Sequence, residues 1–268
     1  MEKKTAIVTG ASSGIGKAIS ERLVRMGYEV YGIGRNFGLF PRENVAGGVS
    51  DDSKVNSVDG RCCGEDIGSE LCGYGCFHPI VCDLRDTGRL PDILRNIMKE
   101  ADGKLSLLVN NAGAAYYGLH EELNPDKISE MVRVNLEVPM ILTQQLLRTL
   151  KENKGNVINI SSVTAISSNP HGVAYGATKA GLMNFSRSLF DEARKYGIGV
   201  TAILPDMTDT ALYRNADFGT DDHPEAHLEP SDVADAVEYA LSVREGTCVP
   251  EIVLRPQIHR IKKKNKTG

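Results

Sequence analysis

Short runs of apolar and β-branched residues alternate with segments of helical periodicity along nearly the whole chain. This alternation is typical of βαβ units and predicts an α/β fold with a mostly parallel sheet. Several runs are almost continuously apolar, as expected for strands that helices cover on both faces. Seven strands are predicted, at residues 5–9, 29–33, 80–82, 105–109, 156–160, 200–204 and 251–254. Helices are predicted between them, at residues 15–26, 90–101, 126–150, 175–196 and 230–243.

Two segments depart from this alternation. Residues 36–79 are rich in Gly, Asp, Ser and Cys without a sustained period, which predicts a loop-like insertion between the second and third strands. Residues 260–268 are strongly basic, with five Lys or Arg at positions 260–266. We expect a solvated tail there, after a single domain of residues 1–259; a binding patch is the alternative.

The composition fits one sizeable domain. Of the 268 residues, 41% are hydrophobic, which is enough to bury one substantial core. The net charge of -4 predicts no field that would attract nucleic acid or an acidic membrane, so a small-molecule partner is expected. The N-terminus lacks an apolar run of signal-peptide length, and no stretch of about 18 apolar residues occurs. We therefore expect a soluble, cytoplasmic protein.

A glycine-rich turn links the first predicted strand to the first predicted helix. Its sequence, TGASSGIG, contributes Gly10, Ser12, Ser13, Gly14, Ile15 and Gly16. Glycines let the backbone turn tightly and approach a pyrophosphate, and the start of the helix favours its negative charge. The turn therefore predicts a dinucleotide site, with an ordinary glycine-rich βα turn as the alternative.

A candidate acid–base group occurs further along, where Tyr175 and Lys179 are four residues apart on one predicted helix. Residues at this spacing share a helix face, so both side chains can act on one ligand. A nearby ammonium, like a cationic nicotinamide, favours the phenolate of a tyrosine whose free pKa is near 10. Ser162 ends a predicted strand and can hold the same substrate oxygen. Taken alone, the Tyr–Lys spacing also occurs by chance in many proteins.

Together these motifs resemble the short-chain dehydrogenase/reductase family. TGxxxGxG precedes a serine that is thirteen positions before the tyrosine of YxxxK, and NNAG at residues 110–113 follows the fourth strand. The resemblance implies a Rossmann-type doubly wound parallel seven-stranded sheet in a three-layer sandwich. It also implies catalytic roles for Asn135, Ser162, Tyr175 and Lys179. The backbone carbonyl of Asn135 would hold a water that links Lys179 to solvent; a helix Asn at a kink before Pro139 is the alternative.

The resemblance also implies further contacts to the cofactor. Beyond Tyr175 and Lys179, the positions are Asp83 and Leu84 near the adenine, Asn111, Ala112 and Gly113 beside the adenosine, and Pro205, Thr208 and Thr210 near the nicotinamide. A strand-end Asp such as Asp83 is alternatively a turn residue. Asp206 stands where the family usually has glycine, which puts the local backbone in doubt. Residues 207–228 would form a lid that selects the substrate.

The end of the second strand predicts the choice of cofactor. An acidic side chain there would hold the ribose hydroxyls of NAD and repel a 2′-phosphate, whereas a cation would attract that phosphate. Gly34 occupies the usual acidic position and Arg35 follows it. This favours NADP(H); the alternative is that Arg35 stacks on adenine and tolerates NAD(H) as well.

Four of the six cysteines cluster in the insertion, at Cys62, Cys63, Cys72 and Cys76. Four thiolates can bind zinc, but these are not the paired C-x2-C of structural zinc sites, so no metal is expected. A surface excursion with reduced thiols is preferred.

The expected activity is the NADP(H)-dependent interconversion of a secondary alcohol and a ketone. The resemblance implies a fairly apolar pocket lined by Tyr116, Tyr117, His171, Met207, Leu212 and Tyr213, which favours a hydrophobic substrate such as a hydroxysteroid. Packing or subunit contact is the alternative role of these aromatic residues. Hydroxy acids, bile acids, acyl thioesters, sugars and xenobiotic carbonyls remain open. A non-catalytic dinucleotide-binding sensor or scaffold is the main alternative; an epimerase or dehydratase of the longer branch is another. The resemblance also implies a homodimer or homotetramer.

Overall fold

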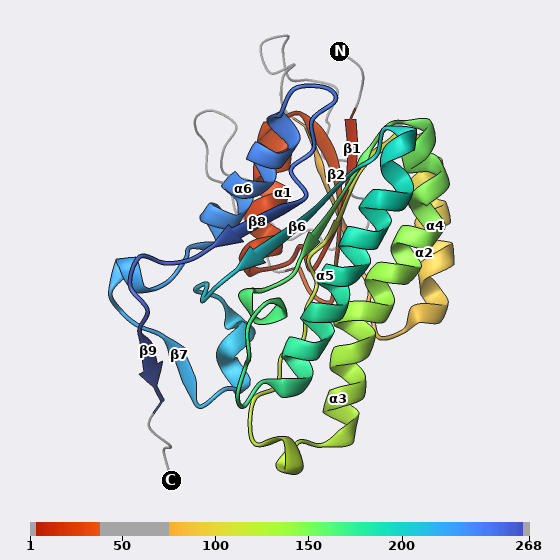
Figure 1. The fold of residues 1–268 in the computed structure, drawn as a ribbon. Coiled ribbons are helices and arrows are strands. Elements are labelled where there is room, and N and C mark those ends of the chain that lie inside the picture. The colour runs from red at the N-terminus through yellow and green to blue at the C-terminus, as the bar shows by residue number, and fades with distance from the viewer. Residues whose placement is uncertain (1–3, 38–74, 265–268) are drawn as a thin grey trace, which may run out of the picture.

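The computed structural model of the chain describes residues 4–37 and 75–264. Seven parallel strands form one sheet in the order β3-β2-β1-β4-β5-β6-β8 (Figure 1). Their bounds are β1 Lys4–Thr9, β2 Tyr28–Gly34, β3 Phe77–Val81, β4 Leu105–Asn110, β5 Asn156–Ile160, β6 Gly199–Pro205 and β8 Glu251–Leu254. The predicted fold class is confirmed. Because the strand order reverses between β1 and β4, a ligand-binding crevice is expected outside the carboxyl ends of these strands.

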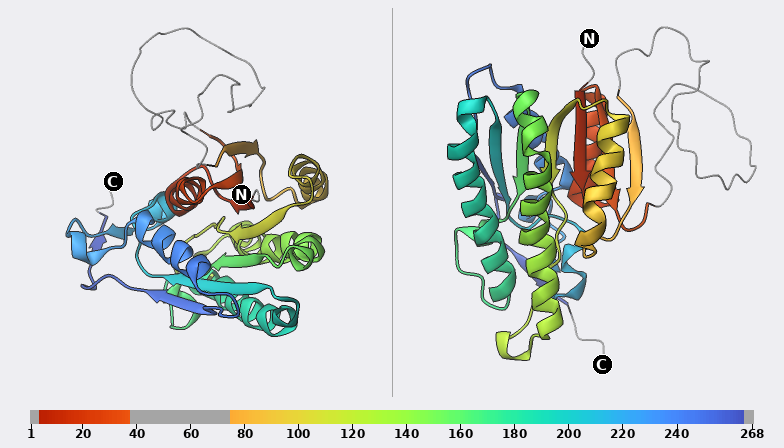
Figure 2. Two further views of the ribbon diagram at one scale, coloured as in Figure 1. Left: turned by 90° about the horizontal axis from the view of Figure 1, so that it is seen from above. Right: turned by 90° about the vertical axis from the view of Figure 1, so that its right-hand side faces the viewer.

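Helices cover both faces of the sheet, which gives three layers (Figure 2). On one face α1 and α6 pack against each other, and α2, α4 and α5 cover the opposite face. The helices are α1 Gly14–Arg25, α2 Leu90–Glu100, α3 Pro125–Val132, α4 Val138–Glu152, α5 Val173–Ala193 and α6 Pro230–Ser242. Short 3-10 helices lie at Thr87–Arg89, His120–Glu122, Val163–Ala165, Arg194–Tyr196, Ala211–Asn215 and Pro224–Ala226.

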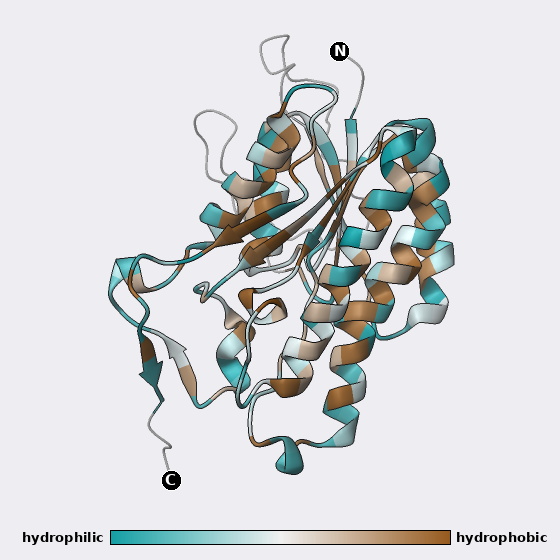
Figure 3. Cartoon of the chain, in the orientation of Figure 1, coloured by the Kyte–Doolittle hydropathy of each residue, from teal (hydrophilic) through white to brown (hydrophobic). Residues whose placement is uncertain are grey.

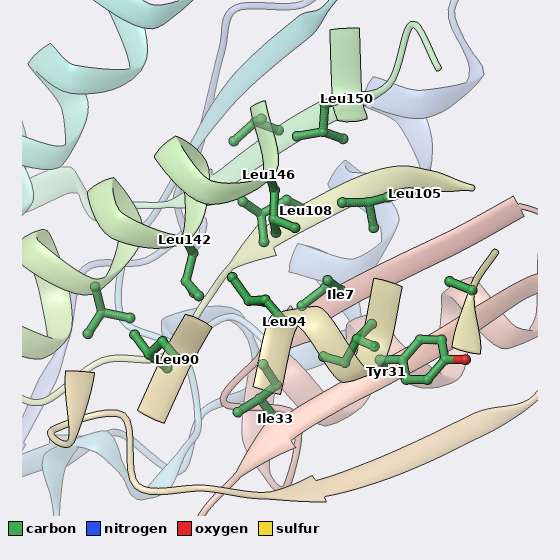
Figure 4. Close-up of a cluster of buried hydrophobic side chains, with 14 of the residues drawn as sticks. Ile7, Tyr31, Ile33, Leu90, Leu94, Leu105, Leu108, Leu142, Leu146 and Leu150 are labelled. Atoms are coloured by element: carbon green, nitrogen blue, oxygen red, sulfur yellow. The ribbon is translucent and has the colours of Figure 1, made fainter. Parts of the chain in front are cut away.

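The core consists of one layer of side chains on each side of the sheet. Alternate residues of a strand point to opposite faces, so Ile7 packs toward α2 and α4 whereas Val8 packs toward α1 and α6. Figure 4 shows the first layer, where leucines of α2 and α4 meet Ile7, Tyr31 and Ile33. The central strands are hydrophobic along most of their length (Figure 3), in agreement with burial on both faces.

The prediction of one continuous helix at residues 126–150 is wrong, because a π-helical turn interrupts it. The structure has α3, a π-helical turn at Arg133–Glu137, and then α4. Pro139 is the second residue of α4, where its missing N–H removes a hydrogen bond from the preceding turn. A π-helical turn of this kind often marks a functional site, and Asn135 lies in it.

The third strand begins earlier than predicted. It spans Phe77–Val81 rather than residues 80–82, so Pro79 lies inside a strand and not at the end of a loop. A proline is tolerated there because β3 is an edge strand of the sheet. Residues 38–74 of the predicted insertion, including Cys62, Cys63 and Cys72, lie outside the described residues.

A second, two-stranded sheet was not predicted. β7 (Phe218–Thr220) pairs antiparallel with β9 (Ile261–Lys263), and both lie below the main sheet in Figure 1. Part of the basic segment that was expected to be a solvated tail is therefore a strand. No helix within residues 4–37 and 75–264 has the length and apolarity required to span a membrane.

Candidate active site

A cleft of about 830 Å³ lies at the carboxyl ends of the strands, where the strand order predicts it. Segments that follow β1, β2, β3, β4, β5 and β6 all line it. Of the predicted site residues, every one except Asn135 lines this single cleft. They are Gly10, Ser12, Ser13, Gly14, Ile15, Gly16, Arg35, Asp83, Leu84, Asn111, Ala112, Gly113, Ser162, Tyr175, Lys179, Pro205, Thr208 and Thr210.

The glycine turn connects β1 to the first turn of α1. Gly10 and Gly14 have positive φ angles of 68° and 51°, which residues other than glycine rarely adopt. A Cβ atom at Gly16 would overlap the carbonyl oxygen of Gly10. Ser13 caps α1 without a side-chain hydrogen bond, and the first turn carries no acidic residue. The open amides of this helix start are therefore available to an anion.

The segment after β4 is bound tightly to this turn. The Thr9 hydroxyl accepts hydrogen bonds from the backbone N–H groups of Asn111 and Ala112, both at 3.0 Å. The Asn111 side chain donates to the carbonyl oxygen of Thr9 at 2.9 Å. The two glycine-containing motifs, about 100 residues apart in the sequence, thus form one wall of the cleft.

Charged residues surround the end of the cleft at β2 and β3. Arg35 is exposed directly after β2 and lines the cleft. The carboxylate of Asp83 is held by the guanidinium of Arg85, whose Nε lies 3.0 Å from both carboxylate oxygens. These hydrogen bonds lower the pKa of Asp83, and the charge of Arg35 contributes in the same direction. Arg85 was not predicted as a site residue.

Ser162 and Tyr175 meet deep in the cleft. Ser162 follows β5 and begins a 3-10 helix, whose Thr164 N–H donates to its hydroxyl at 3.2 Å. Tyr175 lies in the first turn of α5 and is only 4% exposed. Burial raises the pKa of Tyr175 above its usual value, and a hydrogen bond with Ser162 acts in the opposite direction. The phenol therefore stays protonated at neutral pH, with the serine hydroxyl beside it.

Lys179 lies one helical turn after Tyr175 and is 3% exposed. Its ammonium donates to the carbonyl oxygen of Ile160 at 2.8 Å and lies 5.8 Å from the centroid of the Tyr175 ring. Burial lowers the pKa of Lys179 from 10.5 to about 8. Most Lys179 side chains are still charged at pH 7, so a cation lies beside the phenol.

Asn135 is fully buried behind the cleft rather than in its lining. Its side-chain oxygen accepts from the backbone N–H of Ala114 at 2.8 Å. Its side-chain nitrogen donates to the carbonyl of Ala114 at 2.9 Å and to the Thr178 hydroxyl at 3.0 Å. Asn135 thus connects the segment after β4 to the helix that carries Tyr175 and Lys179.

Asp206, which replaces the glycine usual in the family, does not disrupt the segment after β6. One oxygen of its carboxylate accepts from the backbone N–H of Met207 at 2.8 Å, and the other lies 3.6 Å from the guanidinium of Arg255. The Thr208 hydroxyl donates to the backbone carbonyl of Asp206, whereas Thr210 lies against Gly14 of the glycine turn. The segment between β6 and α6 is thereby brought over the glycine turn.

The ring of Tyr117 lies against that of Tyr175, and the rings of Tyr213 and Phe218 pack on Tyr117; we call Tyr117, Tyr213 and Phe218 the aromatic wall. The centroid of the Tyr117 ring lies 5.9 Å from that of Tyr175, 6.2 Å from that of Tyr213 and 5.0 Å from that of Phe218. Tyr116, His171, Met207 and Leu212 also line the cleft, as the sequence predicts. Phe218 was missed, because three strand residues in an irregular segment carry no clear periodicity.

Four basic residues of the cleft were also missed: Arg214, Arg255, His259 and Lys263. We call them the basic rim. Three of them follow β8, near the C-terminus, where the only signal was a high density of positive charge. Within residues 4–37 and 75–264, no group of three or more His, Cys, Asp or Glu side chains is arranged to hold a metal ion.

Comparisons with known proteins show the family of the chain. The sequence matches the short chain dehydrogenase family over residues 4–42 and 59–219. A protein of Staphylococcus epidermidis, described only as an uncharacterized oxidoreductase, is 30% identical over 257 residues, which cover 96% of this chain and 98% of that protein. A similar oxidoreductase of Staphylococcus aureus strain N315 is 32% identical over 255 residues, or 94% of this chain and 97% of its own.

A solved structure shares the fold over nearly its whole length. It is an alcohol dehydrogenase from the archaeon Thermococcus sibiricus complexed with 5-hydroxy-NADP, with a TM-score of 0.75 and 25% identity, covering 97% of this chain and 99% of that one. The chain that carries this glycine turn and this buried Ser–Tyr–Lys cluster belongs to the short-chain dehydrogenase family.

Proposed function

We propose that this oxidoreductase interconverts a secondary alcohol and a ketone with NADP(H) as cofactor. The observation that carries the proposal is that Ser162, Tyr175 and Lys179 line the same cleft as the glycine turn, with the Lys179 ammonium 5.8 Å from the centroid of the Tyr175 ring. A proton donor and a dinucleotide-binding turn that open into one cleft are what the reduction of a carbonyl requires.

The cofactor fits the residues present. The amides at the start of α1 would hold the pyrophosphate, and the close approach of the Asn111 segment leaves small residues beside the adenosine. Thr208 and Thr210 line the same cleft and would bind the nicotinamide amide. Once bound, the nicotinamide supplies the hydride that reduces the carbonyl carbon.

Arg35 supports NADP(H) over NAD(H). Its guanidinium is exposed at the end of β2, and no acidic side chain occupies the preceding position, which is Gly34. Asp83, the nearest carboxylate toward β3, is neutralised by Arg85. A 2′-phosphate would therefore meet positive charge. The Thermococcus relative was solved with an NADP derivative, in keeping with this choice.

The acid–base chemistry follows from the protonation of the buried groups. Tyr175 is protonated before reaction and donates its proton to the substrate oxygen, which Ser162 holds in place. The phenolate that remains would be costly in so buried a position, and the ammonium of Lys179 offsets this cost. A proton from solvent then restores the phenol. Oxidation of the alcohol follows the same path in reverse.

Asn135 has a positioning role in this proposal. Its three hydrogen bonds connect α5 to the segment after β4. They thereby hold Tyr175 and Lys179, both on α5, in position in the cleft. The carbonyl groups of its π-helical turn are suited to hold a water that links Lys179 to solvent.

The aromatic wall favours a hydrophobic substrate, of which hydroxysteroids are one class. We further propose that residues 207–228 form the substrate lid, because Met207, Leu212, Tyr213 and Phe218 of this segment line the same cleft as Tyr175. We expect a cytoplasmic homodimer or homotetramer. Large exposed apolar residues are available for such an assembly: Val132 on the helix before the Asn135 turn, Met140 on the helix after it, and Val173 at the start of α5.

The test is a screen of secondary alcohols and ketones that follows NADPH absorbance, with wild type and Tyr175→Phe compared throughout. The variant keeps the ring but loses the proton, so kcat should fall by about 10²–10⁴-fold. NADPH binding should stay within about twofold, because the hydroxyl adds little to cofactor affinity. Unchanged turnover in Tyr175→Phe would remove the assigned acid. NADPH binding without turnover of any compound would favour the sensor alternative.

A further inference from the structure

The outer end of the cleft is positively charged. The basic rim brings together Arg214, from the 3-10 helix after β6, and Arg255, His259 and Lys263, from the segment after β8. About 40 to 50 residues separate Arg214 from the other three in the sequence. The family's motifs contain none of these residues, and the proposed chemistry does not use them.

The pairing of β7 with β9 holds this rim in place. Phe218, Gly219 and Thr220 pair with Lys263, Lys262 and Ile261. The backbone N–H of Lys264 donates to the carbonyl of Asp217 at 2.8 Å, and its ammonium donates to the carbonyl of Tyr213 at 2.5 Å. The C-terminal segment is therefore attached to the stretch that carries Tyr213 and Phe218 of the aromatic wall.

The side chains of β9 alternate between two environments. Ile261 and Lys263 line the cleft, whereas the ammonium of Lys262 pairs with Asp222 and takes no part in the lining. This is the period of two expected along a strand. Lys263 therefore faces the substrate space, and its neighbour provides a natural control.

The charges at this end do not balance. Arg255 is paired with Asp206, and Asp217 is the other carboxylate among the lining residues here. Within residues 4–37 and 75–264, neither Arg214 nor Lys263 forms an ion pair. Two cations thus face one carboxylate, and an anion would be attracted to this end of the cleft.

An apolar path leads from the rim to the catalytic tyrosine. Lys263 is the strand partner of Phe218, whose ring lies 5.0 Å from that of Tyr117, which in turn lies 5.9 Å from that of Tyr175. Directly paired residues of neighbouring strands have Cβ atoms about 5 Å apart on the same face. A ligand that reaches from Tyr175 to Lys263 would therefore lie along the rings of Tyr117 and Phe218.

We infer that the substrate is an apolar ketone, or the matching alcohol, whose end remote from the carbonyl carries an anionic group bound by Lys263 and Arg214. The inference rests on the proposed function and narrows its substrate class. The carbonyl would bind at Tyr175, the hydrocarbon body against the aromatic wall, and the anion at the basic rim. A charged amine makes hydrogen bonds with carboxylate and phosphate oxygens alike.

The first experiment compares matched substrates with wild-type protein and NADPH. The probes are methyl-ketone carboxylic acids of increasing chain length, their methyl esters, and phosphate-ended ketones of the same lengths. We expect kcat/KM to be about tenfold higher for the acid or the phosphate than for the ester, as a charge-assisted hydrogen bond provides. The preference should be greatest at one chain length, and added salt should reduce it.

The second experiment assigns the preference to residues. Lys263→Gln and Arg214→Gln should each reduce the ratio of acid to ester severalfold, mainly through KM for the acid. Lys262→Gln removes the same positive charge at the neighbouring position and should retain the wild-type ratio. Because Lys263 and Arg214 are exposed, folding should be intact, and the dissociation constant of NADPH checks this.

Two outcomes would overturn the inference in distinguishable ways. Esters turned over as fast as the acids and phosphates, or an acid preference unchanged in both Lys263→Gln and Arg214→Gln, would remove the anion site and leave the oxidoreductase intact. Absence of NADPH oxidation with every ketone would remove the proposed function as well.

Discussion

The two ends of the cleft are built in different ways. At the cofactor end, formed by the glycine turn, Arg35, Asp83 and the Asn111 segment, each contributing group directly follows a strand of the parallel sheet. At the substrate end, the aromatic wall and the basic rim come from irregular segments and from a two-stranded sheet outside the main one. The register of the main sheet therefore fixes the first end, whereas pairing between two distant segments fixes the second.

The two ends differ in how strongly the local sequence constrains their geometry. Backbone amides and positive-φ glycines bind a dinucleotide through geometry that a short local sequence specifies. A substrate surface has no such fixed geometry, because rings and charges from different segments can combine in many ways. The cofactor end is thus suited to a shared cofactor, and the substrate end to variation among relatives.

The largest effect is expected at Lys179, where the two ends meet. Burial lowers its pKa from 10.5 to about 8. Between pH 8 and 10.5 the unfolded chain binds more protons than the folded one, so wild-type stability should rise with pH across this window. Below pH 8 the cost of the buried charge is fully present. Lys179→Met should remove activity yet raise the free energy of unfolding at pH 7 by roughly 2–3 kcal/mol.

Denaturant unfolding from pH 7 to 10.5 measures this, with Lys104→Met as the control for an exposed lysine. Lys104→Met should keep the rise in stability above pH 8 that wild type shows, and only Lys179→Met should lose it. A variant that is less stable than wild type at pH 7 would show that the hydrogen bond to Ile160 outweighs the cost of burial.

The next effect is confined to the cofactor end. Arg35→Asp replaces an attraction for the 2′-phosphate by a repulsion, and KM for NADPH should rise about 10–100-fold while KM for NADH changes little. Arg244→Asp makes the same charge change away from the cleft and should alter neither value. Initial rates with both cofactors measure it. Equal effects on NADPH and NADH would instead favour stacking of Arg35 on adenine.

The smallest effect is expected at the substrate end. Phe218→Ala removes ring contacts to Tyr117 and Tyr213, so KM for a hydrophobic ketone should rise about tenfold. Phe218→Tyr should restore most of the loss, because it keeps the ring. Fluorescence titration should give an unchanged NADPH dissociation constant for both variants. A parallel loss of NADPH affinity would mean that the two ends are not independent.

Most of the fold was predictable from the sequence, because a buried parallel strand must be apolar along its length and an amphipathic helix must repeat every 3.6 residues. The errors have local causes. Pro79 is compatible with a strand only because β3 is an edge strand, and the π-helical turn at Asn135 interrupts a helix whose apolar pattern continues through it. Neither the edge position nor the extra residue of a π-turn can be read from periodicity.

The sequence by itself determined the parallel sheet, the glycine turn and the candidate acid–base group, since spacing along one strand, turn or helix specifies each of them. Only the tertiary structure decided that Phe218 and Lys263 lie opposite each other at the mouth of the cleft, and that burial moves the pKa of Lys179 downward. The physical reason is that pairing of distant segments and exclusion of water depend on the whole packed chain, whereas a turn or a helix face depends on a few neighbouring residues.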